Sequence, residues 1–177
     1  LSALSLGARY IDEDLNRLWH RERVEQIELA TQEPASVEEA ELRALLAEIR
    51  LAVSRTSGDT YFIDLHTTSA PGSPFVVVAD TLLNRRLATM LPAPIVLGLE
   101  EHLSGTLLNF VNDLGHVAAG FEGGQHDAPA SIAMHELGIW QTLRLAGCVE
   151  PPPERARAEP PLRRHFEGGL RVVEVRY

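Results

Sequence analysis

The fold class follows from one stretch, residues 61–72, which reads Tyr61-Phe62-Ile63-Asp64-Leu65-His66-Thr67-Thr68-Ser69-Ala70-Pro71-Gly72. An apolar run ends in Asp-x-His, and a loop of small polar residues with Pro and Gly follows it. This pattern predicts a buried strand that carries an acid and an imidazole to its C-terminal end and then turns. Because Asp64 and His66 are two residues apart, their side chains project from the same face of the strand. The stretch alone leaves two interpretations of His66 open: a metal ligand or general base, and a core histidine hydrogen-bonded to its neighbour.

Predicted helices and strands alternate along the rest of the chain. A capping box of Ser36 and Glu39 begins a helical apolar stripe that continues to about residue 56. Strands are also predicted at 73–79, 94–98 and 117–124, and helices at 81–91, 105–114 and 127–146. This alternation predicts an α/β fold of three α/β/α layers around a mostly parallel mixed sheet.

The chain divides into three parts. We expect residues 1–149 to form one well-buried domain. Residues 150–169 are rich in proline and predict a stiff linker. Residues 170–177 alternate like a half-buried strand, and we expect them to start a C-terminal β portion.

Composition narrows the classes of partner and compartment. The formal net charge of −9 argues against a nucleic-acid partner, which would need a basic face. No apolar run approaches the roughly 18 residues of a membrane span, so we expect no membrane partner. The single cysteine, Cys148, allows no intrachain disulfide, so a reducing, cytoplasmic location is expected. All 16 basic residues are arginine, which removes lysine as a catalytic base.

Three polar clusters stand out against this background, and two of them lie where predicted strands end. Ligands of open α/β sheets bind just beyond the carboxyl ends of the strands. Arginine offers a fork of donors suited to planar carboxylates. The clusters are Arg9 with Asn16 and Arg17, Asp64 with His66, and Glu122 followed by Gly123 and Gly124.

The motifs in these clusters resemble those of a known enzyme family. Arg-Tyr-Ile-Asp-x-Asp-Leu-Asn-Arg at 9–17, Asp-Leu-His-Thr-Thr at 64–68 and Phe-Glu-Gly-Gly at 121–124 resemble the succinylglutamate desuccinylase/aspartoacylase family, relatives of the zinc carboxypeptidases. The resemblance extends in order over about residues 4–147. It implies a zinc-carboxypeptidase-like catalytic domain that hydrolyses an N-acyl amino acid to a carboxylate and an amine.

The resemblance also implies roles for matching residues. His66 would be a ligand of Zn²⁺, which lowers the pKa of a bound water toward about 7. Glu122 would be the general base that takes a proton from this water and passes it to the leaving amine. Arg9 would polarise the scissile carbonyl and stabilise its oxyanion.

Four further residues complete the implied site. Asn16 and Arg17 would clamp a carboxylate of a small N-acyl amino acid substrate. Asp64 and Asp14 would orient His66 and the arginines. The resemblance leaves the oligomeric state open, and a homo-oligomer is compatible with it.

The sequence departs from the family pattern in three places. The family takes two more zinc ligands from a His-x-x-Glu motif upstream of the Arg-Tyr segment, and none of the 177 residues forms such a motif. We therefore expect the chain to start after this motif, and most of the family's C-terminal β portion to be missing. An arginine that aspartoacylase carries before the catalytic glutamate is replaced near Asn112, which argues against substrates derived from aspartate.

Other interpretations remain open at this point. The chain could be a zinc carboxypeptidase acting on peptides, or a non-catalytic fragment or paralogue that binds small carboxylates. His126, after the glycine turn, is either a site residue or a solvated loop residue. We expect His135 and Glu136 to lie on the surface of a helix.

Overall fold

A computed structural model of the chain describes residues 2–150 and 171–175. The predicted linker lies outside the described residues except for residue 150, and the division into three parts stays a prediction. The elements in chain order are α1 (Ser2–Leu6), η1 (Leu15–Arg17), α2 (Arg21–Leu29), α3 (Val37–Ser54), β1 (Tyr61–Thr68), β2 (Phe75–Val77), α4 (Leu82–Met90), β3 (Ile95–Leu97), η2 (Glu100–His102), α5 (Leu107–Asp113), β4 (Val117–Gln125), α6 (Pro129–Leu145) and β5 (Val172–Glu174).

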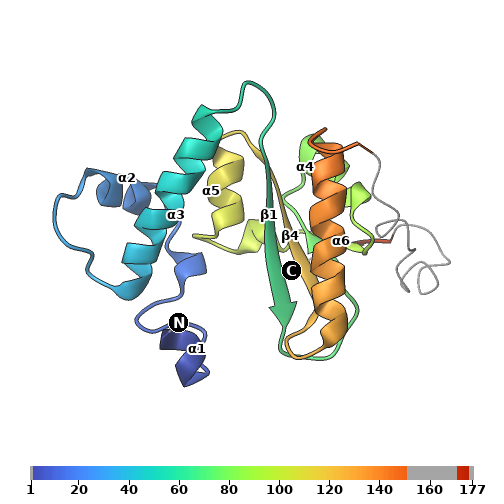
Figure 1. Cartoon of the computed structure of the whole chain (residues 1–177), viewed down its shortest axis with the longest axis horizontal. Coiled ribbons are helices and arrows are strands. Elements are labelled where there is room, and N and C mark those ends of the chain that lie inside the picture. The colour runs from blue at the N-terminus through green and yellow to red at the C-terminus, as the bar shows by residue number, and fades with distance from the viewer. Residues whose placement is uncertain (1, 151–170, 176–177) are drawn as a thin grey trace.

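The elements form three layers. Within the described residues the sheet has five strands in the order β1-β4-β2-β3-β5. The pairs β1/β4, β2/β3 and β3/β5 are parallel, and β2/β4 is antiparallel. Helices α2, α3 and α5 lie on one side of the sheet, and α4 and α6 lie on the other (Figure 1). This arrangement confirms the predicted α/β/α fold with a mostly parallel mixed sheet.

The strand that organises the sheet is β4. It pairs with β1 on one side and β2 on the other, and all of its residues except Glu122 and Gln125 are buried. In contrast, β1 lies at the edge of the sheet in the described part of the chain, and Leu65 is exposed. The prediction of a buried strand in this stretch was therefore wrong, because no residue of β1 is buried. An apolar run indicates that a strand packs against other elements, but it does not indicate whether the strand is central or at the edge of the sheet.

Side chains of β4 alternate between two cores. Ala119 and Phe121 pack in a cluster with residues of α4 and α6, whereas Ala118 packs with residues of α3 and α5. On β1, Ile63 joins the first cluster and Phe62 joins the second. Because strand side chains alternate with a period of two, the even-numbered residues of both strands face the α3/α5 layer near the end of the sheet.

Local sequence explains where helices begin and end. The Ser36 hydroxyl accepts a hydrogen bond from the Glu39 amide at 3.0 Å, as the capping box predicts. The Glu39 carboxylate accepts from the Ala35 amide at 3.2 Å, one residue before the expected partner. The helix predicted at 105–114 is α5, and Gly115 follows it with φ +86°, a backbone conformation that glycine adopts without steric cost and that commonly ends a helix.

The last described strand pairs with β3 but does not alternate. Ile95 donates to the Arg171 carbonyl and Val175 donates to the Leu97 carbonyl, both at 2.9 Å. Val172 and Val173 are both more than half exposed, so the predicted half-buried alternation is wrong for β5.

Gly138 allows α6 to approach β4, and its substitution tests this packing. A Cβ at residue 138 would lie 2.6 Å from Cδ1 of the fully buried Phe121. Alanine favours a helix by about 1 kcal/mol, but overpacking a core costs about 1–3 kcal/mol. We expect Gly138→Ala to lower the free energy of unfolding measured in urea. Gly58→Ala, where a Cβ would meet no described atom within 4 Å, should leave it nearly unchanged.

Candidate active site

The parallel pairing of β1 and β4 places the Asp-x-His and Phe-Glu-Gly-Gly motifs side by side. Asp64 pairs with Gly120 and His66 pairs with Glu122. The register then shifts, because Thr68 pairs with Gln125, so β4 has one more residue than β1 at this point. Such bulges re-aim side chains and are common next to active sites. An imidazole and a carboxylate thus lie together on the α3/α5 face, at the carboxyl ends of two parallel strands.

Asp64 holds the imidazole of His66. Its Oδ2 lies 2.9 Å from Nε2 of His66, and both side chains are partly exposed. This hydrogen bond raises the pKa of His66, and the negative charge of Glu122 acts in the same direction, whereas burial and Arg9 lower it. With Nε2–H donating to Asp64, the lone pair of Nδ1 is the one available for another partner in the neutral ring.

Glu122 has a carboxylate oxygen with no assigned partner. Its Oε2 is buried and makes no hydrogen bond to the described residues. Burial raises the pKa of Glu122, and the nearby His66 lowers it. A buried polar atom without a partner usually marks a bound water, an ion or a catalytic group.

The loop before α2 carries the candidate substrate-binding residues. Nε of Arg9 lies 3.0 Å from the Asp14 carboxylate, which also accepts from the Asn16 amide at 3.0 Å. Oδ1 of Asn16 accepts from the Leu107 amide at 2.9 Å and so connects η1 to the start of α5. Arg17 is exposed and donates to the Asn16 carbonyl at 2.6 Å.

Glu38, which the motifs did not single out, anchors this loop. It is 7% exposed, and its carboxylate accepts from the amides of Ile11, Asp12 and Glu13 at 2.6, 3.1 and 3.4 Å. These backbone donors, led by Ile11, lower the pKa of Glu38. In the sequence Glu38 is one of several acids at a helix start, and its partners are 25 to 27 residues away. Only the folded chain reveals its function as an anchor.

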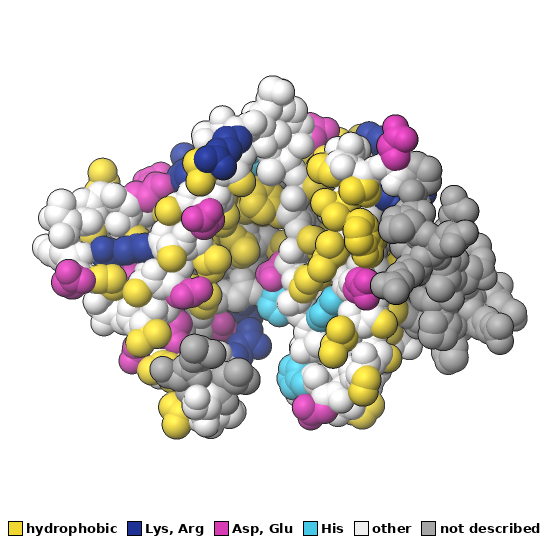
Figure 2. Space-filling model, viewed as in Figure 1, with side chains coloured by type: hydrophobic (Ala, Val, Ile, Leu, Met, Phe, Trp, Pro, Cys, Tyr) yellow, Lys and Arg dark blue, Asp and Glu magenta, His cyan; other side chains and the backbone are white. Residues whose placement is uncertain are grey.

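A cleft of about 740 Å³ lies between this loop, the start of α3 and the end of β1. On the face drawn in Figure 2, histidine side chains gather with acidic and arginine side chains around a notch. Glu122 and Arg17 are not among the residues that line the cleft. The predicted site residues that do line it are Arg9, Asp14, Asn16, Asp64 and His66.

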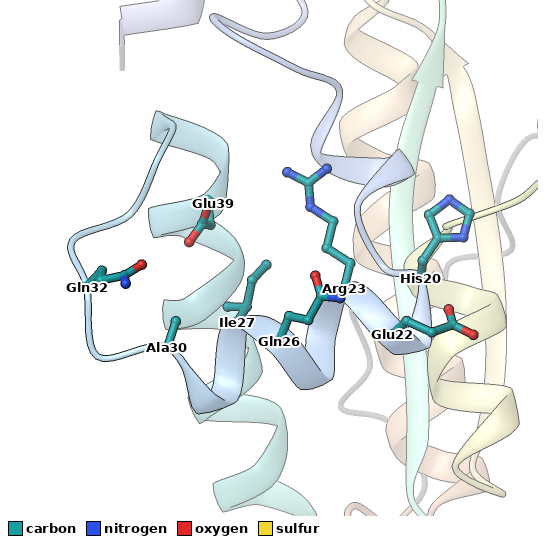
Figure 3. A pocket seen from close by; sticks show the side chains of 8 residues that line it. All are labelled: His20, Glu22, Arg23, Gln26, Ile27, Ala30, Gln32 and Glu39. Atoms are coloured by element: carbon teal, nitrogen blue, oxygen red, sulfur yellow. The ribbon is translucent and has the colours of Figure 1, made fainter.

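A second cavity, of about 600 Å³, lies beside α2 and the start of α3 (Figure 3). It is lined by polar side chains, but Arg23 pairs with Glu13 at 2.6 Å and Glu39 pairs with Arg43 at 2.6 Å. Two of its lining charges are therefore already paired, and none of the site residues predicted from the motifs lines this cavity. The cleft is therefore the candidate site.

Two histidines near the cleft differ from each other in burial and partner. His126 is exposed and lines the cleft, and its Nδ1 lies 2.7 Å from the Thr67 hydroxyl. His135 was expected on the helix surface, and this prediction was wrong, because it is partly buried and its Nε2 donates to the His66 carbonyl at 2.7 Å. Glu136, beside it, is exposed as expected. Helical periodicity could not identify the partner of His135, which lies 69 residues away.

The described residues fit zinc only in part. Nδ1 of His66 makes no hydrogen bond to the described part of the chain and suits a metal. However, a catalytic zinc needs about three protein ligands. Residues 2–150 and 171–175 contain no group of three or more His, Cys, Asp or Glu side chains arranged to hold a metal ion.

The comparisons with known proteins support a likeness in fold. No protein-family model and no curated protein matches the chain. Among solved structures, succinylglutamate desuccinylase/aspartoacylase from Rhodobacter sphaeroides matches with a TM-score of 0.65 at 22% identity. Succinylglutamate desuccinylase from Vibrio parahaemolyticus matches with 0.63 at 19%, and the product-bound ectoine utilization protein EutE (DoeB) from Ruegeria pomeroyi with 0.62 at 18%. Each match covers 99% of this chain and 49% of the other.

This chain has the desuccinylase/aspartoacylase fold. It spans about half the length of the structures that it matches. The fold implied by the three sequence motifs is thereby confirmed. Within the described residues, no helix is both long and apolar enough to cross a membrane.

The anchor at Glu38 gives a test that depends on pH. Because its pKa is lowered from 4.5 in the folded state, its stabilising effect is present above that value and disappears as the pH falls through the folded pKa. We expect Glu38→Gln to lower the melting temperature at pH 7, and the difference from wild type to shrink toward pH 3. Glu48→Gln, at an exposed position of the same helix, serves as the control. A melting difference that does not change with pH would show that the charge of Glu38 is not what holds the loop.

Proposed function

We propose that the protein is a zinc-dependent hydrolase of C–N amide bonds that cleaves a small N-acyl amino acid, or a related acyl amide, to a carboxylate and an amine. The observation that carries the proposal is the pairing of His66 with Glu122 at the ends of two parallel strands, beside the cleft. A partly buried carboxylate whose Oε2 has no described partner is suited to hold and deprotonate a water. The desuccinylase/aspartoacylase fold supports the proposal by analogy.

His66 is the proposed zinc ligand among the described residues. Its Nδ1 would be one ligand, and Asp64 would fix the ring through Nε2. The further ligands would come from outside the described residues, because these contain no group of three. When bound, zinc would supply Lewis acidity and lower the pKa of a water.

Glu122 would then transfer the protons of the reaction. Its carboxylate would take a proton from the attacking water as the C–O bond forms, and it would give this proton to the nitrogen as the C–N bond breaks. Burial raises its pKa, which makes it a stronger base than an exposed glutamate. The scissile carbonyl would bind beside His66, which lines the cleft and pairs with Glu122.

The loop at 9–17 would bind the substrate. The guanidinium of Arg9, held by Asp14, would stabilise the oxyanion that develops on the carbonyl oxygen. Asn16, from the wall of the cleft, and Arg17, from the exposed end of η1, would bind a substrate carboxylate. Since Oδ1 of Asn16 is bonded to the Leu107 amide, its NH₂ group is the part that can donate.

The assignment of Glu122 predicts a large loss of rate on substitution. We expect Glu122→Gln in the full-length protein to lower kcat for N-acyl amino acids by about 10²- to 10⁴-fold, because general-base catalysis contributes about this much. Glu136→Gln, on the exposed face of α6, should retain wild-type activity. Retained activity in Glu122→Gln would remove this residue from the mechanism. Faster turnover of C-terminal peptide substrates than of N-acyl amino acids would favour a carboxypeptidase.

The proposed metal gives a separate test. Mass spectrometry of the full-length protein should find one zinc per chain, and His66→Ala should lose it. A chelator should abolish hydrolysis, and added zinc should restore it in the wild type but not in His66→Ala. A full-length protein without bound metal and without hydrolysis would instead favour a non-catalytic binder of small carboxylates.

A further inference from the structure

We propose that His135 is a positioning residue that holds the backbone of His66 from the opposite side of the sheet, and that Gly123 lacks a side chain to leave room for its ring. The inference rests on the proposed function insofar as His66 and Glu122 are the groups whose positions matter. It adds a residue that the sequence motifs do not indicate.

The hydrogen bond to His66 defines the chemistry of His135. A carbonyl oxygen only accepts, so Nε2 of His135 must carry a proton to donate at 2.7 Å. His66 is an even-numbered residue of β1 like Phe62, which packs with the α3/α5 cluster, so its side chain projects toward that layer. His135 lies on α6, which covers the other side of the sheet (Figure 1). His135 therefore fixes the main chain of His66 without occupying the cleft side of the sheet.

The ring of His135, and not the backbone conformation of residue 123, explains why this residue is a glycine. Gly123 does not have a positive φ, so its conformation is open to other residues, whereas Gly124 has φ +124°. A Cβ at residue 123 would collide with the imidazole of His135, lying 2.5 Å from its Cδ2 and also too close to its Nε2. The first glycine after Glu122 therefore serves the packing of His135, and the second serves the turn.

The ring is held on another side as well. It stands edge-on to Phe121, with ring centroids 6.0 Å apart and planes at 68°. Phe121 is fully buried and precedes Glu122 on β4. One imidazole thus contacts the residue before Glu122, the residue after it, and the carbonyl of His66, which pairs with Glu122.

The contacts of His135 lie where the pairing of β1 with β4 becomes irregular. The register of β1 and β4 shifts directly after the pair of His66 and Glu122. Where regular pairing ends, a side chain donor from α6 bonds to the last regularly paired residue of β1. The bond from His135 therefore supports the position of His66 relative to Glu122 at the place where the sheet supports it least.

The test compares two substitutions of His135 in the full-length protein. His135→Gln keeps an N–H donor at the end of a flexible chain, and His135→Leu removes it. We expect His135→Leu to lower kcat for N-acyl amino acids about tenfold with KM nearly unchanged. Loss of a residue that positions a catalytic group typically lowers activity by about this factor. His135→Gln should recover most of the rate. Wild-type kcat in His135→Leu, or equal losses in both variants, would overturn the inference.

A double substitution tests the role of Gly123. Gly123→Ala should displace the ring and lower kcat about as much as His135→Ala does. In Gly123→Ala/His135→Ala the added methyl group has room, so the double variant should be no slower than His135→Ala alone. Multiplied losses in the double variant would show that Gly123 serves something other than His135.

Two spectroscopic readouts separate this inference from the proposed function, and the first uses only the wild-type protein. Long-range ¹H–¹⁵N spectra of wild-type imidazoles should show His135 with its proton on Nε2, and the Nδ1–H tautomer would overturn the inference. In His135→Gln the carbonyl ¹³C shift of His66 should stay close to wild type. If the protein hydrolyses neither N-acyl amino acids nor peptides, the proposed function fails while these two readouts still decide the role of His135.

Discussion

The parallel pairing of β1 with β4 fixes where every candidate catalytic group of the sheet lies. It aligns His66 with Glu122 and Asp64 with Gly120, so that an imidazole and two carboxylates share one face. A slip of one residue would turn a whole strand over and bring Phe121 to the cleft side. The register is held because β4 packs against both layers, with Phe121 and Ala119 in one core and Ala118 in the other. Packing of apolar side chains thereby determines the geometry of the polar site.

Carboxylates hold the loop that carries Arg9 beside this pair. Glu38 accepts three backbone amides of the loop, and Asp12 in turn accepts the amide of Val37 at the start of α3 at 3.0 Å. Asp14 binds both Arg9 and the Asn16 amide. Some of the acidic residues behind the net charge of −9 therefore accept hydrogen bonds within the protein. Charged acceptors form stronger hydrogen bonds than neutral ones and can order a loop with little core of its own.

The two glycines after Glu122 meet different physical demands. Gly124 adopts φ +124°, where a side chain is strained, whereas Gly123 leaves space for the ring of His135. Gly138 on α6 similarly leaves space for Phe121. Contacts between α6 and β4 thus depend on missing side chains at two places, and the helix comes close enough for His135 to reach the main chain of β1.

The sequence by itself determined the elements and the fold class, because periodicity, caps and turn residues act over a few neighbours. The strand with Asp-x-His, the helix from Val37 and the helix α5 lie close to where their local patterns predict them. Motif order also indicated the desuccinylase/aspartoacylase fold and the candidate site residues. Only the tertiary structure decided that β4 is central and β1 lies at the edge, that Glu38 anchors the loop, and that His135 contacts His66. These contacts join residues 25 or more positions apart, and their formation depends on how whole layers pack, which no local pattern encodes.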